Sequence, residues 1–214
     1  MKNQIKNRAE GGNLLAQNLT NYKNCSDVLV LALPRGGVPV AFEIASFLNA
    51  KLDICLVRKI GVPSQKELAM GAIAMGDIVV FNQEILQSLN ITQETFNQVK
   101  IKEKQELNRR EKKYRGEKPF PYIENQTIIL VDDGIATGST LEAALLSIKK
   151  QNPSQIIIAV PVAPQSICNH LAKKVDKIIC LIQPRYFKSL SLWYDDFSQT
   201  TDEEVCELLN KINF

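Results

Sequence analysis

Two adjacent carboxylates followed by a loop of small residues are the part of this sequence best suited to chemistry. Asp132 and Asp133 come directly after the aliphatic run 128–131. A run without polar alternation is typical of a strand covered on both faces, and open α/β sheets bind ligands at the carboxyl ends of such strands. Residues 136–140 then offer successive backbone N–H groups and three hydroxyls with little bulk. The pattern predicts an anion-binding loop at a helix N-terminus, beside two acids.

A ribose 5-phosphate needs acceptors for its 2′ and 3′ hydroxyls and donors for its phosphate, and two acids before such a loop supply both. Residues 128–140, IILVDDGIATGST, resemble the phosphoribosyl pyrophosphate (PRPP) loop of the type I phosphoribosyltransferases. The resemblance implies that Asp132 and Asp133 hold the ribose hydroxyls and act in catalysis. The other PRPP-binding residues would be Gly134, Ile135, Ala136, Thr137, Gly138, Ser139 and Thr140. The alternative is an ordinary strand-to-helix connection with solvated aspartates.

Two positions of this loop depart from the family. Gly134 stands where many members carry an aliphatic residue, which loosens the loop without removing a ligand group. Ala136 stands where hypoxanthine and guanine enzymes carry an Asp, so the usual oxopurine base is missing and the loop looks more like the adenine type. His170, the only histidine, falls in a predicted helix far from the motif and suits a structural role. Glu67 is a candidate base by its location alone.

A second loop with Arg35, Gly36 and Gly37 is expected at the carboxyl end of the first strand, on the same sheet edge as the acids. Glycines let the backbone approach a ligand, and a guanidinium grips phosphate oxygens bidentately. The resemblance makes this the pyrophosphate loop. Arg58 and Lys59 are expected to end the neighbouring strand and to face the same leaving group, where Arg35 and Lys59 would neutralise its charge. Solvation is the alternative for this pair.

Residues 100–118 hold nine basic and four acidic side chains, in a chain whose net charge is only +3. The family carries a loop that closes over PRPP in the corresponding region, so the resemblance implies a mobile cover at about 61–120. Arg109 or Arg110 would then reach the pyrophosphate on closure. The alternative is a solvated helix face.

The C-terminal segment contains aromatic residues among polar ones. Trp193 and Tyr194 are candidates for a wall on which a flat acceptor stacks, with plain packing as the alternative. Asp195 and Asp196 resemble the acidic position near magnesium in purine enzymes, so Asp196 is a weak, water-mediated metal candidate. The resemblance implies Mg²⁺ as cofactor.

The elements that must position these residues follow from periodicity and from turn and capping signals. Strands are predicted at 28–33, 52–57, 128–131, 156–160 and 177–182, with a hairpin at 68–75 and 78–81. Helices are predicted at 13–18, 38–48, 91–115, 139–150, 166–173 and from 201, the last with a capping box. Strand and helix alternate, which predicts an α/β fold: a doubly wound, mostly parallel five-stranded sheet with helices on both faces. We expect one domain over 1–214, with a core at about 26–183 and a hood of about 184–200 plus the N-terminal flank.

Composition limits the class of protein to which this chain can belong. A chain of 214 residues with 45% hydrophobic and 23% charged residues is typical of a globular domain. The polar start and the lack of an apolar run near ~18 residues argue against a signal peptide or a membrane helix, so a cytoplasmic protein is expected. Five scattered cysteines without a CxxC pair suggest neither a disulfide framework nor a zinc site. The absence of GxGxxG excludes a nicotinamide dehydrogenase of the usual kind.

Two functions remain. LALPRGGVPVAFEIA, LVRKIGVP, ELAMGAIA and WYDDFSQT extend the resemblance to predicted bacterial phosphoribosyltransferases of unassigned acceptor. The first function is transfer of 5-phosphoribosyl from PRPP to a nitrogen acceptor, such as a nucleobase, with release of pyrophosphate. The alternative is a regulatory protein that binds PRPP or nucleotides with little turnover. A homodimer is expected by analogy, and no nucleic-acid module or membrane segment is recognised.

Overall fold

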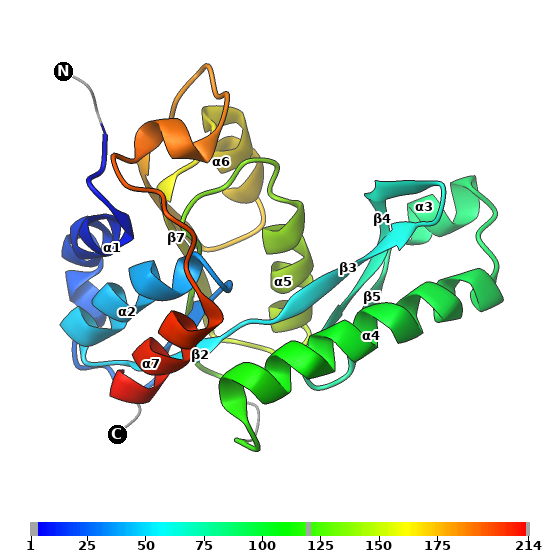
Figure 1. Cartoon of the computed structure of the whole chain (residues 1–214), viewed down its shortest axis with the longest axis horizontal. Coiled ribbons are helices and arrows are strands. Elements are labelled where there is room, and N and C mark those ends of the chain that lie inside the picture. Colours follow the sequence, from blue (N-terminus) through cyan, green and yellow to red (C-terminus); the bar gives the residue numbers. More distant parts are fainter. Residues whose placement is uncertain (1–3, 119–120, 213–214) are drawn as a thin grey trace. The chain divides into compact units, whose positions relative to one another are not determined.

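The computed structural model describes residues 4–118 and 121–212, without the side chains of Lys66 and Glu67. The chain forms two compact units (Figure 1). The first contains the described residues of 1–54, 121–138 and 152–214, and the second contains those of 55–120 and 139–151. The predicted insertion at about 61–120 therefore lies in the second unit, which begins at residue 55 and also includes the helix after the PRPP-like loop.

The first unit is built on a five-stranded parallel sheet, as the sequence predicts. Its strands run in the order β2-β1-β6-β7-β8, with β1 (Val28–Ala32), β2 (Lys51–Ile54), β6 (Thr127–Val131), β7 (Gln155–Val162) and β8 (Lys177–Ile182). Every residue of β1 and β6 is buried, which explains their unbroken apolar runs. Strand order reverses between β1 and β6, and this switch point is where open α/β sheets bind ligands.

Helices of the first unit pack on this sheet and on one another. They are α1 (Arg8–Gln17), α2 (Gly37–Leu48), α6 (Gln165–Leu171) and α7 (Asp202–Ile212), with short 3₁₀ helices η1 (Thr20–Tyr22) and η2 (Leu190–Trp193). Figure 1 shows α1, α2 and α7 side by side, and α2 contacts both of the other two. Helix α1 begins earlier than predicted because the Asn7 side chain caps it, accepting the backbone N–H of Glu10 at 3.0 Å.

The second unit is an antiparallel sheet covered by helices. It contains β3 (Val57–Val62), β4 (Gln65–Ala74), β5 (Ile78–Phe81), α3 (Gln83–Ser88), α4 (Gln93–Arg115) and α5 (Ser139–Lys149). The predicted hairpin and the long polar helix capped by Thr92 are confirmed. Helix α5 contacts all three strands. Its buried residues include the predicted stripe of Leu141, Ala144, Leu145 and Ile148.

The predicted strand at 52–57 is wrong. Strand β2 ends at Ile54, and Val57 begins β3 in the other sheet. Arg58 and Lys59 therefore lie inside an antiparallel strand and not at the end of a parallel one. The segment LDICLV contains no glycine, proline or polar cluster that would mark the change of sheet, so periodicity joined two strands into one.

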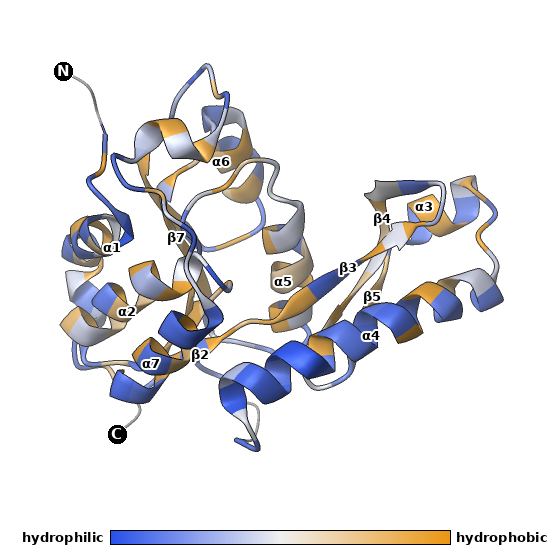
Figure 2. Ribbon diagram, in the orientation of Figure 1, coloured by the Kyte–Doolittle hydropathy of each residue, from blue (hydrophilic) through white to orange (hydrophobic). Residues whose placement is uncertain are grey.

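Helix α4 is hydrophilic over most of its length in Figure 2. Its buried residues are Phe96, Leu107 and Arg115. Phe96 belongs to the core of the second unit, with Ile60, Val62, Met70 and Ile73. Within the described part of the chain, no helix combines the length and apolar character needed to cross a membrane.

Candidate functional site

The loops that follow β1 and β6 meet closely in the first unit. Strands β1 and β6 are in register to their last residues, Ala32 and Val131. A Cβ atom on Gly36 would collide with the Asp133 carboxylate, and one on Gly37 would lie 2.8 Å from the Val131 carbonyl oxygen. The two glycines are required by this close approach. The prediction that both loops share one sheet edge is confirmed.

Asp132 lies against Gly37 at the start of α2 and is partly buried. Its Oδ1 accepts the backbone N–H of Asp133 at 2.9 Å. Burial raises the pKa of Asp132 well above its usual range, and the negative charge of Asp133 raises it further. Asp132 can therefore carry a proton at a pH where an exposed aspartate would have lost it.

Asp133 is paired with Arg8, a residue that the sequence reasoning missed. The Nη2 and Nε atoms of Arg8 lie 2.7 and 2.9 Å from Asp133 Oδ2. The Nη1 atom of Arg8 donates to the Ser198 carbonyl at 2.6 Å, and its guanidinium lies 4.2 Å from the centre of the Phe197 ring. Arg8 belongs to a polar N-terminal stretch with no motif, so no local signal distinguished it from a solvated arginine.

The predicted hood holds the backbone of the acid pair. The Tyr194 side chain is buried, and its hydroxyl donates to the Asp133 carbonyl oxygen at 2.6 Å. Its ring lies 4.9 Å from that of Phe197 and in one apolar cluster with Ile5. Trp193 packs on the same cluster, and its buried indole Nε1 has no hydrogen-bond partner among the described residues. Packing thus accounts for the ring of Tyr194, while stacking of an acceptor on Trp193 stays a prediction.

Gly134 does more than loosen the loop. A Cβ atom there would lie 3.1 Å from the Val162 carbonyl oxygen and would overlap the side chain of Leu190 from η2. Gly134 therefore gives room to a residue of the hood. The backbone N–H of Ile135 donates to the same Val162 carbonyl at 2.9 Å, while Ala136 and Thr137 are exposed.

Two other predicted residues of the first unit have identified partners. Arg35 is partly exposed and lies 3.7 Å from Asp202, the first residue of α7. Asp196 Oδ1 accepts the backbone N–H of Ser198 at 2.9 Å, and this hydrogen bond lowers the pKa of Asp196. Among the described residues, no group of three or more His, Cys, Asp or Glu side chains is placed to hold a metal ion.

Three of the predicted cations of the second unit are paired with glutamates. Arg58 of β3 contacts Glu103 at 2.6 Å. Arg109 and Arg110 both contact Glu106 at 2.8 Å, and their hydrogen bonds lower the pKa of Glu106 to about 2. Lys59 lies beside Arg58 in β3, and the side chain of Glu67 is outside the described residues. The structure does not test the prediction that these cations reach a pyrophosphate.

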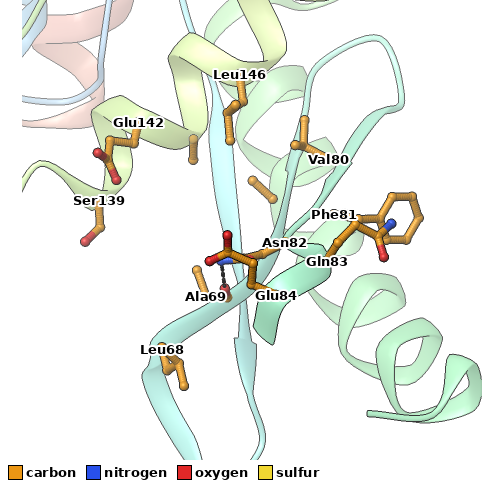
Figure 3. Close-up of a pocket in the computed structure, with 13 residues that line it drawn as sticks. Leu68, Ala69, Val80, Phe81, Asn82, Gln83, Glu84, Ser139, Glu142 and Leu146 are labelled. Atoms are coloured by element: carbon orange, nitrogen blue, oxygen red, sulfur yellow. Dashed lines mark hydrogen bonds between the residues drawn. The ribbon is translucent and has the colours of Figure 1, made fainter. Parts of the chain in front are cut away.

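The second unit also contains an open cavity of about 650 Å³ (Figure 3). Ala69, Ala72 and Val80 form part of its apolar lining, and Leu68 and Leu146 lie at its sides. Glu84 and Glu142 are charged residues on its wall, and Ser139 of the PRPP-like loop also lines it. The Asn82 side chain donates to the Ala69 carbonyl at 3.3 Å, the dashed contact in Figure 3.

Comparison with known proteins agrees with this fold. Two curated relatives from Mycobacterium tuberculosis strains, one named "Putative phosphoribosyl transferase Rv0571c", are each 38% identical over 204 residues, which is 95% of this chain and 46% of theirs. The chain thus spans about half the length of these relatives. The crystal structure of TT1426 from Thermus thermophilus is 34% identical with a TM-score of 0.89, covering 97% of this chain and 98% of that one. AQ2163 from Aquifex aeolicus, 12% identical with a TM-score of 0.51 over 85% of this chain and 77% of that one, shares the fold.

The match to a family extends over most of the sequence. The sequence model described as the phosphoribosyl transferase domain matches residues 2–189. This span contains both loops at the switch point, the whole second unit and η1, and it ends just before η2. The chain therefore belongs to the phosphoribosyl transferase domain family.

Proposed function

We propose that this protein transfers the 5-phosphoribosyl group of PRPP to a nitrogen acceptor, such as a nucleobase or a related small molecule, and releases pyrophosphate. The observation that carries the proposal is the close meeting of the loops after β1 and β6. A Cβ atom on Gly36 would collide with the Asp133 carboxylate, and one on Gly37 would lie 3.0 Å from Asp132 Cα, at the point where strand order reverses. An arginine, Arg35, precedes these glycines.

The acid pair suits stabilisation of a cationic sugar. Displacement at an anomeric carbon passes through an oxocarbenium-like state, so positioning and charge supply most of the catalysis. Asp132 and Asp133 would accept the ribose hydroxyls and favour the positive ring, each contributing about 2–4 kcal/mol if they act like other preorganised groups. The high pKa of Asp132 in the free protein supports this, because an approaching cationic ring would favour its ionised form.

The loop after the acids would bind the 5-phosphate. Ala136 and Thr137 are exposed, and α5 begins at Ser139, so backbone N–H groups of residues 136–140 are candidates to donate to phosphate oxygens. Arg35, Gly36 and Gly37 would bind the pyrophosphate. Arg58, Lys59 and Arg109 are proposed to join them when the segment at about 61–120 covers the substrate, which would exclude water from the reacting sugar.

Magnesium fits this donor set. Mg²⁺ takes oxygen ligands and keeps several waters, and it is usually held by one or two carboxylates plus substrate phosphates. Asp196 is the carboxylate proposed to contact the ion, through water, and the substrate phosphates would supply further oxygen ligands. The ion would supply charge neutralisation for the pyrophosphate oxygens. The chain's own residues would orient the ribose and exclude solvent.

The hood supports a flat heterocycle as the acceptor. The indole of Trp193 offers an apolar face and a buried N–H group without a protein acceptor among the described residues, which suits a flat heterocycle. Ala136 provides no acid for an oxopurine. We expect a homodimer by analogy with the family, with PRPP and a small-molecule acceptor as the binding partners.

Pyrophosphate release from PRPP and Mg²⁺, measured across a panel of nucleobases and small amines, tests the proposal. Turnover with one acceptor supports the enzyme. Tight PRPP binding without consumption would instead favour a regulatory protein, and no PRPP binding would contradict both.

A more local test is Asp133→Asn. We expect turnover to fall by about 10²–10³-fold, because a preorganised group that stabilises the charged state is lost. Circular dichroism should show a folded protein, since Asn can still accept a hydrogen bond from Arg8. The matched control is Asp27→Asn, an exposed aspartate before β1, at the opposite end of that strand from the acid pair. Unchanged turnover in Asp133→Asn would contradict the assignment.

A further inference from the structure

We propose that Arg8 is a positioning residue that fixes the Asp133 carboxylate for the ribose and ties it to the hood. The inference rests on the proposed function, because Asp133 is one of the two acids assigned to the sugar. Arg8 is the first residue of α1 and is separated from Asp133 by 125 positions in the sequence.

The Arg8 guanidinium is held by several contacts of different kinds. Two of its nitrogens contact a single carboxylate oxygen, Asp133 Oδ2, at 2.7 and 2.9 Å. A third nitrogen donates to the Ser198 carbonyl, and the face of the guanidinium covers Phe197. A planar guanidinium held on an oxygen, a carbonyl and a ring has little freedom to rotate. It therefore fixes the oxygen that it binds.

The ion pair between Arg8 and Asp133 is largely buried. The Arg8 and Asp133 side chains are only 11% and 14% exposed. A partly buried ion pair is weakly screened, and loss of one partner leaves an uncompensated charge. Asp133 also lies beside Asp132, and Arg8 is the cation that opposes repulsion between the two acids.

Arg8 differs from the other contacts of Asp133 because it binds the side chain. The Tyr194 hydroxyl holds the Asp133 carbonyl, and Gly36 leaves space for the carboxylate. These contacts position the main chain of Asp133 whether or not Arg8 is present. Arg8 alone among these three contacts binds the side chain of Asp133, and it engages one of the two carboxylate oxygens. A ribose hydroxyl can approach the other oxygen without displacing Arg8.

The contacts of Arg8 with Phe197 and Ser198 also connect Asp133 to the hood. The same guanidinium contacts the PRPP-like loop and the segment after Tyr194. A change in the hood would therefore move the ligand-binding carboxylate. Arg8 couples the part proposed to bind the acceptor to the acid proposed to bind the donor.

The test is calorimetric titration of PRPP with Mg²⁺ into wild type, Arg8→Ala, Arg8→Lys and the control Arg185→Ala. Arg185 is an exposed arginine in the segment before the hood helix. We expect Arg8→Ala to weaken PRPP binding about tenfold to hundredfold, as expected for loss of hydrogen bonds to a charged group. Arg8→Lys should recover part of the affinity, and Arg185→Ala should bind like wild type.

Added methylguanidine distinguishes positioning from a structural role. It should restore part of the PRPP affinity of Arg8→Ala, because a free guanidinium can occupy the vacated place beside Asp133, and it should leave wild type and Arg185→Ala unchanged. If Arg8→Ala does not fold, Arg8→Gln takes its place in the comparison, because its shorter side chain also vacates the guanidinium position. Wild-type affinity in Arg8→Ala, or a loss that neither lysine nor methylguanidine reduces, would overturn the inference and leave the proposed function standing. No PRPP binding by wild type would overturn both.

Discussion

The two acids at the switch point are chemically different although they are adjacent in sequence. Asp132 is partly buried and its pKa is raised, whereas Asp133 is paired with Arg8. A carboxylate with a raised pKa and a carboxylate held by a guanidinium are suited to different tasks in one reaction. The negative charge of Asp132 is costly in the free protein.

This difference predicts that Asp132→Asn stabilises the free protein in a pH-dependent way. A raised folded-state pKa favours the protonated acid, so the contribution of Asp132 to stability is present below its ordinary pKa of about 3.9 and is lost as pH rises toward the folded-state value. Asn does not ionise, and its Oδ1 can still accept the Asp133 N–H. The Tm difference between Asp132→Asn and wild type should grow from pH 4 toward neutral pH.

Thermal unfolding across that pH range, with Asp195→Asn as the control, measures the effect. A Tm difference that does not change with pH would contradict the burial of an ionisable Asp132.

At the scale of elements, the second unit combines a tight antiparallel sheet with a long exposed helix. Gly71 in β4 packs so closely that a Cβ atom would lie 2.6 Å from the Val80 carbonyl oxygen and 3.0 Å from the Phe96 ring. Helix α4, by contrast, carries Glu106 with both Arg109 and Arg110 on its exposed surface. The sheet depends on close packing, and the polar helix face depends on ion pairs that water weakens.

We predict that Gly71→Ala lowers the free energy of unfolding by about 1–3 kcal/mol, as expected for an added methyl group without space. The nearest atoms belong to backbone and to a buried ring, which cannot simply rotate away. Urea unfolding measures the change, with Ser64→Ala in an exposed turn of the same unit as control. Equal stability of both variants would mean that β4 and β5 are less closely packed than described.

A second prediction concerns Glu106, whose pKa of about 2 keeps it ionised and paired over the physiological range. If Arg109 binds the pyrophosphate, it must first leave Glu106. Glu106→Gln should then tighten PRPP binding about twofold, since exposed ion pairs contribute about 0.2–1 kcal/mol. Glu111→Gln changes the same charge on the same helix and serves as control. Equal affinities of the two variants in calorimetry would remove Arg109 from the proposed site.

At the scale of the whole molecule, the chain passes between its two units several times. One junction lies between residues 138 and 139, inside the PRPP-like loop, and another lies at 54–55, where one sheet ends and the other begins. The family match at residues 2–189 includes the second unit as well as the parallel sheet.

Hydrogen exchange with and without PRPP and Mg²⁺ tests the roles of the two units separately. We expect slower exchange at residues 33–37 and 132–138, whose backbone would contact the ligand. A cover over the substrate would also slow exchange between residues 67 and 118. Protection confined to the first unit would exclude the cover while leaving the PRPP site intact.

Local patterns in the sequence were enough to predict the five-stranded parallel sheet, apart from the end of β2, and the position of the loop that carries the acids. The apolar run before Asp132 and the small residues after it are contiguous, so neighbouring residues define both a buried strand and the turn that follows it. The hairpin and helix α4 were predictable for the same reason, since a turn and the Thr92 cap mark their ends.

Tertiary structure decided which side chains complete the site. Arg8 and Asp133 are 125 residues apart in the sequence, and Tyr194 and Asp133 are 61 residues apart, so no local periodicity or spacing predicts either contact. The need for glycine at position 134 becomes clear only in the folded protein, where the Leu190 side chain of the hood occupies the space that a Cβ atom would fill. The placement of Arg58 inside β3 depended on a change of sheet within one apolar run. Local sequence determines the secondary structure that a segment prefers, whereas long-range packing determines which other segments it contacts.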